Sequence, residues 1–182
     1  MDQSKGTRTT PRTWIDGLRR HIEDLRTDTY EGAAGPEREA RYRAAFDLLS
    51  IVATGVLADV NDLLLGGTGD ISIQPPGPDG HGGLIGSWML SWPALREARS
   101  RISGKALLPV TISAVWPAGF VHPHLVAGGA VNPRAESLTA WPMQITSAED
   151  AAQQEPLLWA LAAAEVHDRI YQSSWRVVSG RD

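Results

Sequence analysis

The triplet His122-Pro123-His124, followed by a Gly-Gly pair and Asn132, is the stretch whose residue types best suit chemistry. Histidine changes charge near neutral pH, and its ring nitrogens bind metals. On a regular strand, residues 122 and 124 would point to the same face, as a metal site requires. Pro123, however, has no N–H to donate to a strand ladder. We therefore expect the triplet at a sheet edge or in a loop.

Either chemical use of the triplet needs further side chains. A metal site needs a third ligand, and His81 and Glu136 are the candidates, although neither has a diagnostic spacing. As an acid/base pair, His122 or His124 would act on a substrate while Glu136 or Asp79 orients the ring. A third interpretation has one histidine bonded to backbone and the other facing solvent. We predict no bound cofactor, with the metal site as an open alternative.

The same region resembles the active-site signature of ubiquitin-conjugating enzymes. That signature is a His-Pro-Asn turn, then a glycine, an apolar residue and the catalytic cysteine, with Trp-Pro further along. The matching residues here are His122, Pro123, Gly129, Val131, Trp141 and Pro142. The resemblance covers residues 70–172 and implies a meander of three strands between helices.

Two departures from the signature concern its reacting residues. Asn132 occupies the position of the nucleophilic cysteine, and an amide nitrogen cannot form a thioester. His124 replaces the turn asparagine, which in the family stabilises the oxyanion. The resemblance therefore implies a noncatalytic binding or scaffolding protein, with a ubiquitin-like protein or an activating enzyme as partner. The rival hypothesis is a small intracellular enzyme that uses His122 and His124.

Composition excludes several classes of function. The 182 residues include no cysteine, which removes disulfides, thiolate metal sites and cysteine nucleophiles. A net charge of −4 without a basic stripe argues against nucleic acid as a partner. The first residues lack the apolar core of a secretion signal, and Asp59 interrupts the longest apolar run, so we expect no membrane span. We predict a cytoplasmic protein.

Helical periodicity is strongest in the first third of the chain. Trp14, Ile15, Leu18, Ile22 and Leu25 recur at helical spacing and predict an amphipathic helix. Trp14 could anchor a partner or a second copy, so a homodimer is one option. A second, more apolar helix should begin after Pro36 and end at the glycines of 66–69. It is the better candidate to cover a sheet.

The rest of the chain reads as strands followed by helix. Extended segments are predicted at 70–74, 84–92, 107–116 and 141–145, with a short helix at 93–102. We interpret Trp88 and Trp92 as core residues. Thr146 and Glu149 suggest a capping box, before a helix that breaks at Pro156 and runs to about residue 171.

These elements define the expected fold class and its organisation. The fold is α+β: an antiparallel meander of three to four strands with helices packed on one face, plus an N-terminal helical extension. The expected segments are a disordered tail at 1–11, a helical region at 12–66 and an α+β domain at 67–182.

Overall fold

The computed structural model describes residues 14–128 and 140–178, and confirms the α+β class. Five antiparallel strands form one sheet in chain order, so the sheet is a simple meander. The strands are β1 (Asp70–Pro78), β2 (Leu84–Ser91), β3 (Val110–Trp116), β4 (His124–Ala127) and β5 (Ala140–Pro142). The count exceeds the expected three to four because of β4, which has only 4 residues and shows no readable alternation, whereas β5 overlaps the extended segment predicted at 141–145.

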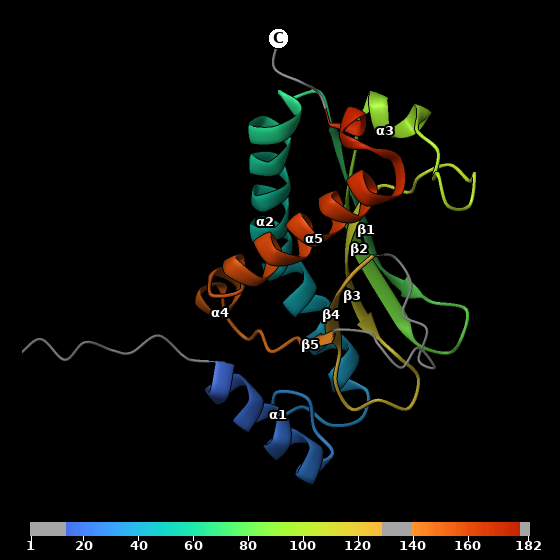
Figure 1. Cartoon of the computed structure of the whole chain (residues 1–182). Helices are drawn as coiled ribbons and strands as arrows, with labels where there is room; N and C mark the ends of the chain where they lie inside the picture. The colour runs from blue at the N-terminus through green and yellow to red at the C-terminus, as the bar shows by residue number, and fades with distance from the viewer. Residues whose placement is uncertain (1–13, 129–139, 179–182) are drawn as a thin grey trace, which may run out of the picture.

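The helices of the described residues are α1 (Trp14–Thr27), α2 (Glu37–Leu65), α3 (Pro93–Glu97), α4 (Ala148–Ala152) and α5 (Glu155–Ser173), and a 3₁₀ turn spans Trp175–Val177. The two longest, α2 and α5, cover one face of the sheet (Figure 1). α2 packs on β1 and β2, whereas α5 packs on β3 and β4 and against α2. As expected, α2 begins after Pro36 and ends at Gly66, which adopts the left-handed conformation (φ 61°).

The hydrophobic core lies between α2, α5 and the sheet. Trp88 of β2 stacks on Phe46 of α2 at a ring separation of 4.4 Å, and its indole N–H donates to Ser50 Oγ. Trp88 and Trp92 are both 0% exposed, which confirms their assignment to the core. By length and composition α2 could also cross a bilayer. Here ten of its residues are buried: Tyr42, Ala45, Phe46, Leu49, Ala53, Val56, Leu57, Val60, Asn61 and Leu65.

The predicted capping box was wrong by one residue. Ser147, rather than Thr146, caps α4 by accepting a hydrogen bond from Asp150 N at 3.1 Å. Asp150 in turn accepts from the backbone N–H and the hydroxyl of Thr146, at 3.1 and 2.6 Å. The helix break before Pro156 is confirmed, since α4 ends at Ala152 and α5 begins at Glu155.

One other predicted element differs in extent. The helix expected over 93–102 ends at Glu97, because Arg99 pairs with Ala106 in an isolated β-bridge. After α5, Trp175–Val177 forms the 3₁₀ turn.

A buried ion pair fastens α5 to the start of β3. The guanidinium of Arg169 donates to the carbonyls of Leu108 and Pro109, both at 2.8 Å, and to Glu165 at 2.7 Å. The carboxylate of Glu165 also accepts from Thr111 N at 3.2 Å. Arg169 and Glu165 are 6% and 7% exposed. This network supplies hydrogen-bond partners for the backbone of residues 108, 109 and 111, which precede the first pair between β3 and β4 at Ile112.

Candidate functional site

α1 contacts the rest of the protein with its polar side. Asp24 is buried on this helix, whereas Leu18, Ile22 and Leu25 are 49%, 41% and 51% exposed. An amphipathic helix on a globular protein ordinarily does the opposite. The reason lies in what α1 meets: polar and histidine side chains around β4 and β5 rather than an apolar surface.

The structure brings the two histidines of the triplet together with a third. His122 lies in the loop before β4 and His124 is the first residue of β4. His21 of α1 packs edge-on against both, with ring centroids 4.3 Å from His122 and 5.9 Å from His124. The Nε2 atom of His122 lies 3.1 Å from Oδ2 of Asp24, which is also on α1. We call His21, Asp24, His122 and His124 the histidine cluster.

Sequence reasoning missed both His21 and Asp24 as members of this cluster, and Asp24 is the one that carries a carboxylate. Its carboxylate accepts from the Thr29 hydroxyl at 2.7 Å, from Glu31 N at 3.0 Å and from Gly32 N at 3.4 Å. It therefore fixes the loop after α1 and faces His122 at the same time. The Thr and Gly residues that follow Asp24 in the sequence are a signal for its contacts with the loop. No feature of the sequence indicates its contact with His122.

The rings of the cluster are uncharged at neutral pH; that of His122 is fully enclosed, and those of His21 and His124 are half-buried. Burial and, after it, the nearby ring of His21 lower the pKa of His122 to about 4, although Asp24 opposes the shift. Burial and His21 lower the pKa of His124 to about 4 as well, and burial lowers that of His21. Within the part of the chain that the structure describes, the Nδ1 atoms of His21 and His122 and the hydroxyl of Tyr30 are buried and find no hydrogen-bond partner. The contact between α1 and the segment around β4 is therefore polar, and some of its buried polar atoms lack a hydrogen bond within the described residues.

These properties limit what the cluster can do chemically. His122 is 1% exposed, so a substrate cannot reach its ring without displacing α1. Among the residues that the structure describes, no group of three or more His, Asp and Glu side chains is arranged to hold a metal ion. The arrangement is suited to docking α1 rather than to proton transfer on a substrate.

The other candidate residues lie elsewhere. Asn132 and Glu136, and with them Gly129 and Val131 of the signature, fall outside the described residues. His81 is exposed in the turn between β1 and β2. Asp79 belongs to the same turn, where its carboxylate accepts from the backbone N–H groups of His81 and Gly83 at 2.7 and 2.8 Å. Of the carboxylates that the structure describes, Asp24 rather than Asp79 lies beside His122.

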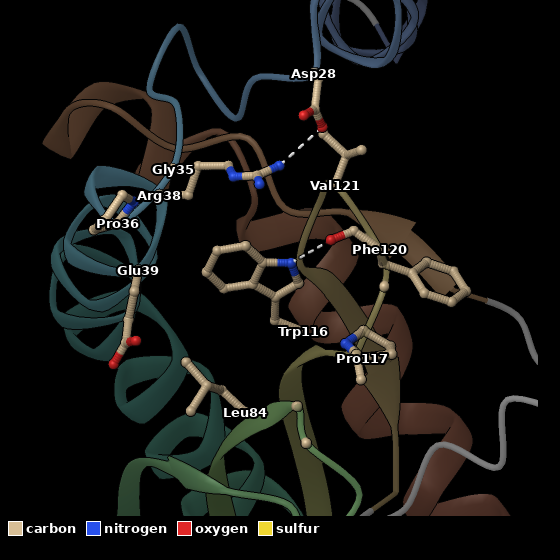
Figure 2. Close-up of a pocket in the computed structure, with 14 residues that line it drawn as sticks. Asp28, Gly35, Pro36, Arg38, Glu39, Leu84, Trp116, Pro117, Phe120 and Val121 are labelled. Atoms are coloured by element: carbon tan, nitrogen blue, oxygen red, sulfur yellow. Dashed lines mark hydrogen bonds and ion pairs between the residues drawn. The ribbon is translucent and has the colours of Figure 1, made fainter.

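A pocket of about 460 Å³ lies near α1, between the start of α2 and two turns of the sheet (Figure 2). Its walls include Arg38 from α2, Leu84 from the start of β2, and Trp116 and Phe120 from the end of β3 and the segment after it. Asp28 from the loop after α1 lies at its margin and accepts a hydrogen bond from Arg38 Nη1 at 3.1 Å. The sequence had marked none of these residues as a binding site.

Comparisons with known proteins returned no relative of this chain. No protein-family model, no curated protein and no solved structure matches it.

Proposed function

We propose that this chain is a noncatalytic binding module that holds a protein partner on the outward side of α1. The observation that carries the proposal is the alignment of Leu18, Ile22 and Leu25, which we call the α1 outer stripe. All three are between 41% and 51% exposed, and they follow each other at intervals of four and three residues. This spacing places them on one side of the helix.

An exposed stripe of this kind is characteristic of an interface. Single apolar side chains are common on the surfaces of monomeric proteins, whereas contiguous ones mark sites of association. Anchors at such intervals are also how an amphipathic helix docks into a groove of another protein. Figure 1 shows α1 at one end of the molecule, where a partner can approach it.

Charge beside the stripe indicates which partner fits. Arg19 and Arg26 lie seven residues apart and therefore on the same flank of the stripe. Their side chains are 74% and 72% exposed, and each forms an exposed ion pair within α1, to Asp16 and Glu23. Such pairs contribute at most about 1 kcal/mol and are easily exchanged. The complementary partner has an apolar groove with an acidic rim.

A second copy of the chain fits less well. Two copies of α1 packed antiparallel through the stripe would place Arg19 and Arg26 of one beside the same arginines of the other. Like charges across an interface are unfavourable. The stripe therefore favours a different protein over a homodimer.

The family resemblance is part of the same proposal. The order of helix, antiparallel meander and helix supports a ubiquitin-conjugating-like scaffold used for binding, with a ubiquitin-like protein or an activating enzyme as partner. The enclosed ring of His122, together with the pKa values of His122 and His124, both lowered to about 4, favours this noncatalytic role over the alternative of a histidine-based enzyme.

Site-specific photo-crosslinking in cells tests the proposal. A photoreactive residue is placed at Leu18 or Leu25, with a matched control at Ile51, which is 76% exposed on α2. We expect one protein to be captured from the α1 positions and not from Ile51. The captured protein is then purified, and its binding should weaken at least about tenfold in the double variant R19E/R26E.

Three results would contradict the proposal. Capture from Ile51 as strong as from Leu18 would show that α1 is not the binding surface. Binding unaffected by the charge reversal would show that the partner has no acidic rim. Cross-links only between copies of this chain, with a concentration-dependent dimer in sedimentation, would replace it by a homodimer.

A further inference from the structure

The pocket beside α2 has the size and lining of a small-ligand site, and it has no role in the function proposed above. Its volume of about 460 Å³ is within the range of about 300–1,000 Å³ typical of such sites. The lining joins one cation, Arg38, to several apolar side chains.

The apolar wall is centred on Trp116. Its indole N–H donates to the Phe120 carbonyl at 2.8 Å, so the ring has no free donor and offers only its apolar surface to a ligand. Leu84 lies beside it, half-buried. Gly83 also lines the pocket, and a larger residue would not fit there because its Cβ would lie 2.5 Å from the Trp116 carbonyl oxygen. This wall suits an apolar group of about the size of an amino-acid side chain.

The polar part of the pocket is the guanidinium of Arg38. One nitrogen, Nη1, donates to Asp28, whereas Nε is enclosed and has no hydrogen-bond partner among the described residues. The Arg38 side chain is 21% exposed, but that of Asp28 is 77% exposed. Because the carboxylate of Asp28 is largely in solvent, its attraction to Arg38 is screened on that side. A ligand oxygen can compete with Asp28 for this guanidinium.

Asp28 is the residue directly after α1, and its φ is 52°, in the left-handed region that residues after a helix end commonly adopt. Here it places the carboxylate against Arg38 at the margin of the pocket (Figure 2).

The first backbone N–H groups of α2 do not provide an anion site. Glu37 N donates to the Ala34 carbonyl and Arg38 N to the Gly35 carbonyl, each at 3.2 Å. An anion in the pocket would therefore be bound by the Arg38 side chain rather than by the helix end.

The balance of charge selects the kind of anion. Arg38 is the cation of the lining, and the carboxylates of Asp28 and Glu39 also line the pocket. Glu39 is already paired with Arg43, through two hydrogen bonds of 3.0 and 2.7 Å. Two nearby carboxylates disfavour a doubly charged phosphate, whereas a carboxylate has one charge and matches a guanidinium edge.

We propose that this pocket binds a carboxylate attached to an apolar group. The carboxylate accepts from Arg38 in competition with Asp28, and the apolar group lies against Trp116 and Leu84. Both a free small carboxylic acid and the C-terminal residue of a peptide have this chemistry.

The test uses the full chain labelled with ¹⁵N and follows the Trp116 indole N–H by NMR. The probes are N-acetyl-L-leucine and a tripeptide ending in leucine, each as the free acid and as the C-terminal amide. We expect the acid forms to shift the Trp116 signal with a dissociation constant below about 10 mM, and the amides to bind at least about tenfold more weakly. Preference for the single residue or for the tripeptide identifies the source of the carboxylate.

Three variants make the test specific. R38Q should weaken binding of the acids at least about tenfold, whereas R41Q, an exposed arginine of the same helix that does not line the pocket, should not change it. D28N removes the competing carboxylate and should tighten binding, which a variant that merely damaged the fold could not do. Equal binding of acids and amides, no binding up to about 10 mM, or weaker binding in D28N would overturn the proposal.

Discussion

Acidification should destabilise the protein through the histidine cluster, and His122 should account for a measurable part of the loss. The pKa of His122 in the folded protein is about 4, against an ordinary value of 6.5. The unfolded chain therefore binds a proton more readily than the folded one. Stability is complete above about pH 6.5, falls as pH decreases from there toward 4, and levels off below.

The size of the effect follows from the two pKa values. For a single site with these values, linkage gives a loss of about 2 kcal/mol at pH 5 and about 3 kcal/mol at pH 4. His124 acts in the same direction, because its pKa is also lowered to about 4. His122 is the better probe because it is 1% exposed, whereas His124 is only half-buried.

The measurement is urea unfolding of the wild type and of H122Q between about pH 7 and pH 4. The substitution changes stability at every pH, so only the slope against pH matters. We expect H122Q to lose about 2 kcal/mol less than the wild type on going to pH 5. H81Q is the matched control, since His81 is exposed in the turn between β1 and β2 and should leave the slope unchanged.

A second measurement locates the change. Hydrogen exchange should show the amides of α1 losing protection before those of α2 as pH falls, because α1 is the element that contacts the cluster. Parallel pH profiles for the wild type and H122Q would refute the reasoning. So would a wild type that became more stable on acidification.

Three further predictions concern the stability of the fold. G86A should destabilise by about 1–3 kcal/mol in urea unfolding, because the new Cβ would lie 2.5 Å from the buried ring of Phe46; no loss would mean that this ring can move. G55A, at an exposed site of α2 with nothing within 4 Å, should stabilise by about 0.5–1 kcal/mol in the same assay. R169M should cost about 3–5 kcal/mol because Glu165 is left buried and unpaired, and adding E165L should recover part of the loss. A double variant as unstable as R169M alone would contradict that explanation.

The elements with strong local signals were predictable from the sequence. α2 was predicted from its long apolar face, from Pro36 at its start and from the glycines after Leu65. β2 and β3 were set by runs of apolar and β-branched residues, and the burial of Trp88 followed from its place on such a strand. β4 was too short for a periodic pattern to form, and β5 covers only the beginning of the extended segment predicted at 141–145.

The candidate site was predictable only in part. The histidine triplet was noticeable by residue type. Its neighbours His21 and Asp24 come from α1, far earlier in the sequence, and no local pattern connects α1 with the triplet. The direction in which α1 faces was not predictable either. Amphipathicity gives the two sides of a helix, but the surface that a helix meets decides which of them is buried.

The bond from the indole N–H of Trp92 to the carbonyl of Val177 has a consequence for synthesis on the ribosome. The apolar face of α2 emerges early, yet the partner of a tryptophan in the same core is made only when residue 177 has been added. A nascent chain must therefore keep this face soluble, unaided or with a chaperone, until residue 177 has been added. Arrested chains that lack Val177 should be digested by protease, and those with Val177 clear of the exit tunnel should resist.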